Sequence, residues 1–279
     1  MKKAISFSIL LGLLAVLPVT AQPNLIPATV NPSGQTVLVP QAAIDNSSAI
    51  SLGTAIDPAS GKKVEGIMFI HYKKAPSHKP QHNPGGGNGG GGTTCFAYLS
   101  NGAKWKTVEN WVMNTSNDEE LNETTLFNLQ SAALVKWEVA AGTGVNILGT
   151  GSATSSTLVA DTSSPDGQNE VYFGDIDSPG VIAVTIVWGI YAGPPSGREL
   201  VEWDQVYDQV TFDWSAQATG VAGKMDFDNI ATHENGHSAG MSHPSDACTD
   251  ETMYRFSTTT ETKKRDLNAG DIAGIDGLY

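Results

Sequence analysis

Residues 233–243 of the chain read His233-Glu234-Asn235-Gly236-His237-Ser238-Ala239-Gly240-Met241-Ser242-His243. On an α-helix, side chains four residues apart share a face and are about 6 Å apart along the axis. The imidazoles of His233 and His237 can therefore reach one metal ion. Gly240 can take the left-handed conformation that ends a helix, and this turn would bring His243 back to the same ion.

Three neutral imidazoles bind zinc well and leave a fourth coordination position open to water, as in catalytic rather than structural zinc sites. Glu234 is adjacent to the first ligand but points in a different direction, so it need not bind the metal. It can instead accept a proton from water that zinc has made more acidic. The alternatives are a helix whose histidines are only packed or exposed, and a zinc-free descendant that keeps the fold.

The sequence around this motif resembles the metzincin zinc proteases, and among them the matrixin (matrix-metalloprotease-like) branch. Met253, in the triplet Thr-Met-Tyr, resembles the methionine of the Met-turn, which packs beneath the zinc ligands. Residues 267–279 are similar to the last helix of the matrixins, residues 180–183 to their edge strand, and residues 104–105 to the start of their catalytic domain. The resemblance spans residues 94–279 and is strongest from residue 224 onward.

For this chain, the resemblance implies an α+β, metzincin-like catalytic domain. Its sheet would be twisted and mostly parallel with an antiparallel edge strand, and three helices and a small C-terminal subdomain with the Met-turn would complete it. By the same resemblance, Val181, Ile182 and Ala183 would bind peptide by strand addition. Met253 and Asp271 would support the zinc ligands, with the aspartate holding the Met-turn from the last helix.

The sequence departs from the matrixin pattern in three places. Pro244 stands where the family usually has serine after the third histidine, and Gly270 replaces the first aspartate of a pair in the last helix. The histidines that hold a second, structural zinc in the family are missing. We therefore expect one zinc ion, the catalytic one.

The periodicity of the rest of the chain predicts a sheet with three helices. Apolar side chains from Leu126 to Trp137 share one helical face, and the helix would open near residues 116–122. A second helix would be capped by Asp226 or Asp228, and a third would begin near Asn268. Strand-like runs occupy residues 66–72, 105–112, 145–147, 171–173, 181–188 and 200–212.

The composition excludes several classes of protein. The chain has 279 residues, of which 16 are Lys or Arg and 29 are Asp or Glu, and its net charge is −13. Binding to nucleic acid or to an anionic membrane requires basic patches, so neither is expected. Two cysteines are too few for a scaffold built on disulfides. We expect a monomer whose partner is a protein or peptide substrate.

The N-terminus predicts export. Lys2 and Lys3 precede an apolar run over residues 4–17, which ends in Pro18-Val19-Thr20-Ala21. This pattern is typical of a secretory signal peptide, and we expect cleavage after Ala21 and a secreted, extracellular product. The alternative is an N-terminal membrane anchor, against which the short run and Pro18 argue.

A boundary is predicted at a glycine tract, residues 85–92, because such runs are typical linkers. Residues 1–21 would be the signal peptide, 22–93 a pro-segment, localisation segment or spacer, and 94–279 the catalytic domain. His71, His78 and His82 precede the tract and are interpreted as exposed linker histidines, which could at most bind metal weakly. Cleavage in the tract as an activation step is a hypothesis.

Two further features remain open at the level of sequence. In an exported protein Cys95 and Cys248 most simply form a disulfide; Cys95 as an inhibitory zinc ligand and two free thiols are the alternatives. Residues 161–170 and 175–177 offer the oxygen ligands that calcium prefers, and calcium is common in matrixins, but solvated acidic turns fit these residues equally well.

Taken together, the residues predict a secreted zinc endopeptidase. One alternative is a secreted binding module that keeps the zinc fold without turnover. Another is a different zinc hydrolase, such as an amidase acting on cell wall, although shorter His-Glu-x-x-His sites lack both the third histidine and the Met-Tyr turn.

Overall fold

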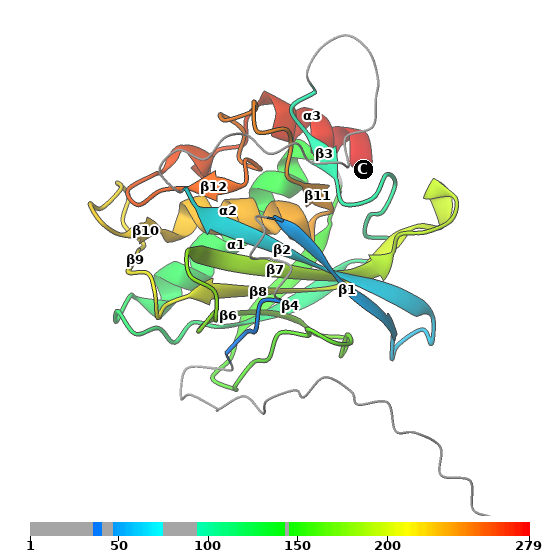
Figure 1. The fold of residues 1–279 in the computed structure, drawn as a ribbon, viewed down its shortest axis with the longest axis horizontal. Helices are drawn as coiled ribbons and strands as arrows, with labels where there is room; N and C mark the ends of the chain where they lie inside the picture. Colours follow the sequence, from blue (N-terminus) through cyan, green and yellow to red (C-terminus); the bar gives the residue numbers. More distant parts are fainter. Residues whose placement is uncertain (1–35, 41–46, 75–93, 143–144) are drawn as a thin grey trace, which may run out of the picture.

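The computed structural model describes residues 36–40, 47–74, 94–142 and 145–279. Its main sheet has the strand order β1-β2-β7-β8-β6-β4-β5, and β12 pairs with β2 beside this path (Figure 1). The strands are β1 (Ala49–Ile56), β2 (Lys63–Lys73), β4 (Glu109–Asn114), β5 (Leu148–Ala153), β6 (Asn169–Gly174), β7 (Val181–Ile190), β8 (Glu199–Asp208) and β12 (Phe256–Ser257). The helices are α1 (Glu123–Ala140), α2 (Phe227–Ser238) and α3 (Ala269–Leu278).

The pairing directions divide the sheet into two parts. Strands β5, β4, β6 and β8 are parallel to one another, whereas β7 is antiparallel to β8, β2 to β7 and β1 to β2. Two short sheets pair β3 (Ala97–Tyr98) with β11 (Met241–Ser242) and β9 (Trp214–Ser215) with β10 (Met225–Asp226). The mixed sheet with three helices in the described part of the chain fits the predicted α+β class.

The prediction that residues 181–183 lie on an edge strand is wrong. Strand β7, which contains them, is internal, because β2 pairs with it from Glu65 opposite Gly189 to Tyr72 opposite Val181. The resemblance to matrixins begins at residue 94, so it gave no information about a strand that precedes this residue and pairs with β7. The partner comes from residues that precede the glycine tract.

Helix boundaries follow from local capping. The side chain of Asn122 accepts a hydrogen bond from the Thr125 amide at the start of α1, and Asp226 does the same for the Asn229 amide at the start of α2. After α2 the chain turns at Gly240, whose φ is 102°. The three predicted helices are therefore present, each close to its predicted start.

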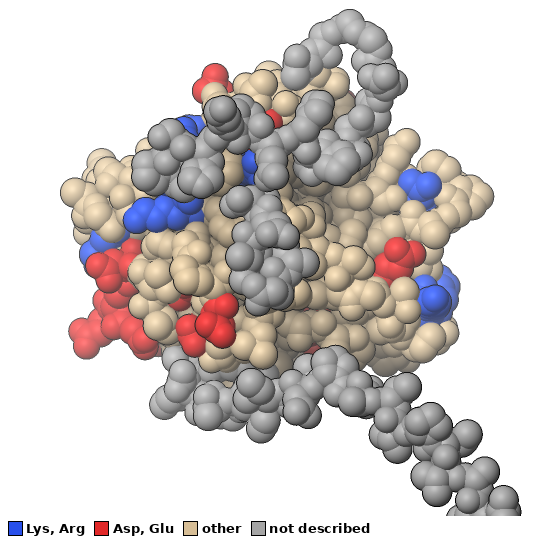
Figure 2. All heavy atoms as spheres, in the orientation of Figure 1, with Lys and Arg blue, Asp and Glu red and all other residues tan. Residues whose placement is uncertain are grey.

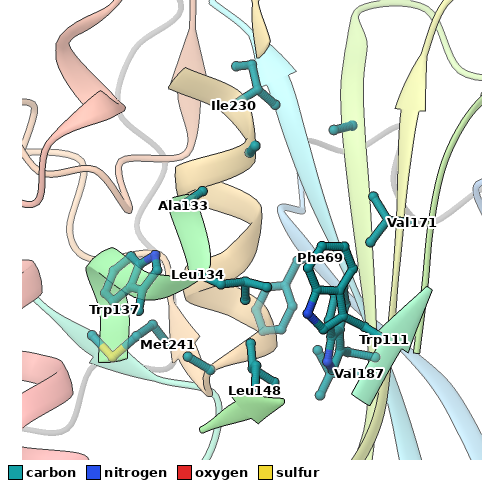
Figure 3. Close-up of a cluster of buried hydrophobic side chains, with 14 of the residues drawn as sticks. Phe69, Trp111, Ala133, Leu134, Trp137, Leu148, Val171, Val187, Ile230 and Met241 are labelled. Atoms are coloured by element: carbon teal, nitrogen blue, oxygen red, sulfur yellow. The ribbon is translucent and has the colours of Figure 1, made fainter. Parts of the chain in front are cut away.

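Two hydrophobic clusters lie against the sheet. The larger packs α1 and α2 onto one face and includes Phe69, Trp111, Trp137 and Ile230 (Figures 1 and 3). The smaller includes Val64, Met68 and Ile70 of β2 together with Trp188 of β7. Strand β2 thus contributes buried side chains to both clusters and is an internal strand of the sheet.

Most of the predicted strands are present. Residues 66–72 lie in β2, 171–173 in β6 and 181–188 in β7, and the runs 105–112 and 200–212 overlap β4 and β8. The strand predicted at residues 145–147 is wrong, because these residues are irregular and β5 begins only at Leu148. The predicted signal peptide lies outside the described residues. Among the described residues, no helix is long and apolar enough to cross a membrane.

Cys95 and Cys248 form a disulfide, with their Cα atoms 5.4 Å apart. The bond joins the chain just after the glycine tract to the segment that follows His243.

On the molecular surface, acidic side chains gather toward the end of the sheet where β9 lies (Figure 2).

Candidate active site

Helix α2 and the turn after it bring three imidazoles together. Nε2 of His243 lies 3.2 Å from Nε2 of His233 and 3.1 Å from Nε2 of His237. All three side chains are buried. The i, i+4 spacing on α2 and the turn at Gly240 produce this convergence, as the sequence predicts.

Hydrogen bonds on the far side of two rings fix their orientation. Nδ1 of His233 donates to the Thr252 carbonyl at 2.6 Å, and Nδ1 of His237 donates to the Met241 carbonyl at 2.9 Å. Since the proton of each neutral ring is on Nδ1, the lone pair of each Nε2 faces the convergence point. Burial lowers the pKa of His237 to about 3 and holds those of His233 and His243 well below the ordinary value.

The donor set fits a zinc ion. Zinc–nitrogen bonds of 2.0–2.1 Å in a tetrahedron place the nitrogens about 3.3 Å apart, close to the separations found here. Lone pairs that face one another in a buried space repel unless a cation lies between them. His233, His237 and His243 therefore form a site suited to a divalent metal.

Glu234 lies beside this triad with both carboxylate oxygens in contact with neighbours. Thr185 Oγ1 of β7 donates to Oε2 at 2.6 Å, and Nδ1 of His71 lies 2.8 Å from Oε1. Burial raises the pKa of Glu234 to about 8. Thr185 was not identified from the sequence. The one indication was that it lies in the strand predicted at residues 181–188, in which alternate side chains share a face.

The interpretation of His71 as an exposed linker histidine is wrong. Its side chain is fully buried, its ring centroid lies 3.9 Å from that of His233, and its Nε2 lies 3.0 Å from Ser257 Oγ. The strand predicted at residues 66–72 could have indicated its burial, because His71 falls on the same face of that strand as the apolar Phe69. His78 and His82 lie outside the described residues.

Residues 252–254 form the floor of the site. Asp271 of α3 accepts hydrogen bonds from the amides of Thr252 at 2.7 Å and Met253 at 3.1 Å. The Met253 side chain is buried against α2. Lys264, which the sequence did not mark, is also buried; its Nζ donates to the carbonyls of Thr252, at 3.1 Å, and Tyr254, and burial lowers its pKa to about 7.

The sequence pattern that defines the matrixin family matches residues 109–279, more than half of the chain. The chain belongs to the matrixin family. No curated protein matches it. Matrixins are zinc metallopeptidases that act on proteins or peptides. The matched residues of this matrixin include the triad, Glu234 and Thr185, whereas His71 and the rest of β2 precede the match.

The matrixin also has an acidic cluster, far from the triad in sequence. Asp161 and Asp166, in the loop before β6, and Glu202 of β8 place three carboxylate oxygens within 4.8 Å of one another. Within the described parts of the chain, Asp161 Oδ2 and Glu202 Oε1 have no hydrogen-bond partner. Burial raises the pKa of Glu202 to about 9 and also raises that of Asp161.

The other predicted acidic segment has a different role. Oδ2 of Asp175 accepts a hydrogen bond from Thr36 Oγ1, and its carbonyl accepts one from the Val37 amide. Residues 175–177 thus pair with residues 36–37 at the end of β6, and they form no metal-binding cluster among the described residues.

Proposed function

We propose that this matrixin is a secreted zinc endopeptidase with His233, His237 and His243 as the zinc ligands and Glu234 as the general base. The observation that supports the proposal is the convergence of three Nε2 atoms beside a buried carboxylate: that of His243 lies 3.1–3.2 Å from the other two. Histidines that only pack in the core or lie on the surface would not be expected to bring three ring nitrogens together at one point. One zinc ion is proposed, because the other histidine-containing cluster among the described residues shares His233 with the first.

Bound zinc would supply Lewis acidity toward water and toward the scissile carbonyl. Glu234 accepts the proton of the attacking water and then donates it to the leaving amine. Burial raises the pKa of Glu234 above its ordinary value in the metal-free site, and the positive charge of a bound zinc ion would lower it again toward the range of a base at neutral pH. Thr185 positions the carboxylate through its hydrogen bond to Oε2.

The supporting residues stabilise this arrangement. Asp271 holds the amides of Thr252 and Met253, and the Thr252 carbonyl in turn orients the His233 ring. We propose that Met253 and Asp271 thereby keep the ligands in place without binding metal themselves. The Cys95–Cys248 disulfide fits a protein that leaves the cytoplasm, which supports the proposed secretion. Cleavage of the signal peptide is proposed after Ala21, from the sequence pattern there.

We further propose that Asp161, Asp166 and Glu202 hold a calcium ion. Calcium prefers oxygen ligands, and Glu202, which is only 1% exposed, has one carboxylate oxygen without a partner in the described residues. Without a cation, burial favours the protonated forms of Glu202 and Asp161, whose pKa values are raised.

The test of the proposed function compares Glu234→Gln with the wild-type chain from residue 22, using denatured casein and a peptide library. We expect the substitution to lower kcat at least about 100-fold while zinc content stays equal, because the amide cannot carry the proton. Glu120→Gln, at an exposed position, is the matched control. Each sample is assayed before and after limited proteolysis between Lys74 and Thr94.

The outcomes separate the alternatives. Retained turnover in Glu234→Gln would remove the general-base role. Zinc binding with no cleavage of any peptide, in every form assayed, would favour the binding module, and cleavage of cell-wall amide bonds alone would favour the amidase.

A further inference from the structure

Strand β2 lies along the side of β7 to which an added peptide strand would have to bind. It is antiparallel to β7, and its end at Tyr72 and Lys73 is parallel to β12 on the opposite side. The amide of Lys73 donates to the Gly180 carbonyl and that of Lys74 to the Ser257 carbonyl, both at 2.8 Å. The end of β2 therefore lies between β7 and β12, and its backbone is hydrogen-bonded to both (Figure 1).

Two side chains of β2 cover the metal-binding imidazoles. The Phe69 ring stacks on that of His237, with centroids 4.0 Å apart and an interplanar angle of 6°. The His71 ring lies 3.9 Å from that of His233. Phe69 is 1% exposed and His71 is not exposed at all, so both rings fill space directly beside the triad.

His71 also contacts the proposed general base. Its Nδ1 is 2.8 Å from Glu234 Oε1, while Thr185 donates to Oε2. His71 thus takes up one acceptor position of Oε1, and its fully buried ring fills the space beside this oxygen. Ser257 of β12, 3.0 Å from the other nitrogen of His71, holds the ring in this position.

We propose that the hairpin β1–β2 is an intramolecular inhibitor that occupies the peptide-binding side of β7, with His71 blocking Glu234. This proposal rests on the peptidase function proposed above. Departure of β2 opens a groove between β7 and β12 that accepts an extended peptide antiparallel to β7 and parallel to β12. The direction of β2 in the groove therefore also indicates the direction in which we expect a substrate peptide to bind.

The covalent structure allows the hairpin to leave. Cys95 and Cys248 bond to each other, so no disulfide connects residues 47–74 to the rest of the chain. A cut between Lys74 and Thr94 leaves the hairpin held by noncovalent contacts alone. The ion pair between Lys62 and Glu199, with an N–O distance of 2.6 Å, has an exposed lysine and contributes little.

The test uses the chain from residue 22 with a specific protease recognition sequence in place of residues 85–92. Peptide cleavage, calorimetric affinity for a peptide hydroxamate, zinc content and amide hydrogen exchange are measured before and after the cut, the freed hairpin being removed on a size-exclusion column. We expect kcat/KM and hydroxamate affinity to rise at least tenfold, exchange at residues 181–190 to become faster, and zinc content to stay equal.

Two further measurements isolate the contact with Glu234. In the uncut chain, His71→Ala should raise turnover several-fold, whereas Lys63→Ala, at an exposed position of the same strand, should not. A synthetic peptide of residues 47–74, added to the cut protein, should restore inhibition and protect β7 again.

Two results would overturn the proposal: equal activity and equal exchange before and after the cut, or loss of folding when the hairpin leaves, which would make β2 a permanent structural strand. If no peptide is cleaved in either form but hydroxamate affinity and exchange change as expected, the hairpin occupies the groove as proposed and the peptidase function fails.

Discussion

Gly236 lies between His233 and His237, the two proposed zinc ligands of α2, on the face of the helix under which Met253 packs. An added Cβ there would lie 2.6 Å from Cζ2 of Trp137 and closer still to Sδ of Met253. The histidine motif therefore specifies a small residue as well as the proposed ligands, because the methionine passes directly beneath the helix.

We expect Gly236→Ala to destabilise the protein. Overpacking costs about 1–3 kcal/mol and should outweigh the gain of about 1 kcal/mol in helix propensity. Urea unfolding would give the free energy of unfolding, with zinc content measured in parallel. Gly197→Ala is the matched control, since nothing lies within 4 Å of an added Cβ there. Equal stability of the two variants would show that the space beneath the helix is not limiting.

At the same scale, sequence reasoning found the residues whose spacing has a chemical meaning and missed those whose role depends on burial. His233, His237, His243 and Glu234 follow from a motif. Lys264 stands in a Lys-Lys-Arg run that is typical of a solvated surface, yet its side chain is fully buried against carbonyls. No local pattern distinguishes it from Lys263, because its partners come from residues 252–254.

At the scale of elements, the helices and most strands were predictable because each has its own periodicity and caps. What could not be predicted was the order of strands across the linker. Strand β2 was recognised as a strand, but its pairing with β7 joins residues 109 to 124 positions apart along the chain, from Tyr72 opposite Val181 to Glu65 opposite Gly189. Hydrogen-bond pairing at this distance leaves no trace in either segment's own pattern.

The loop before β6 and the strand β8 give a prediction on calcium and pH. Because the folded-state pKa of Glu202 is about 9, above its ordinary value of 4.5, the folded state keeps a proton that the unfolded state loses. Without a cation, stability therefore falls as the pH rises from about 4.5 toward 9. A bound cation replaces the proton and prevents this loss.

We therefore expect calcium to raise the midpoint of thermal unfolding by several degrees at pH 8 and much less at pH 5. Differential scanning calorimetry with and without calcium would measure this. Glu202→Gln should abolish the calcium effect, whereas Asp177→Asn, outside the cluster, should retain it. A calcium effect that is the same at both pH values would argue against these carboxyls as ligands.

At the scale of the whole molecule, the disulfide closes a long loop. Cys95 and Cys248 are 153 residues apart in sequence. In the chain-entropy model a loop of this length stabilises the folded state by about 4–5 kcal/mol, and strain or residual structure in the unfolded chain reduces this value.

The double variant Cys95→Ser/Cys248→Ser should accordingly unfold with a free energy lower by about 3–5 kcal/mol. Urea unfolding, followed by circular dichroism, would measure it. The wild-type protein in excess reductant should behave like the double variant. A wild-type protein that keeps its full stability under these conditions would show that the bond contributes little beyond the contacts around it.

Trp188 of β7 gives the molecule an optical probe of its own state. Its ring packs over β2 at Gly66, where an added Cβ would meet it at 2.7 Å, and its Nε1 donates to the Asp161 carbonyl at 2.8 Å. With β2 in place, this indole is buried. If β2 departs as proposed, one face of the ring becomes exposed to water and its emission should move to longer wavelength. The same ring contacts the loop of the proposed calcium site at Asp161, so its fluorescence would respond to calcium binding as well as to release of β2, without any label.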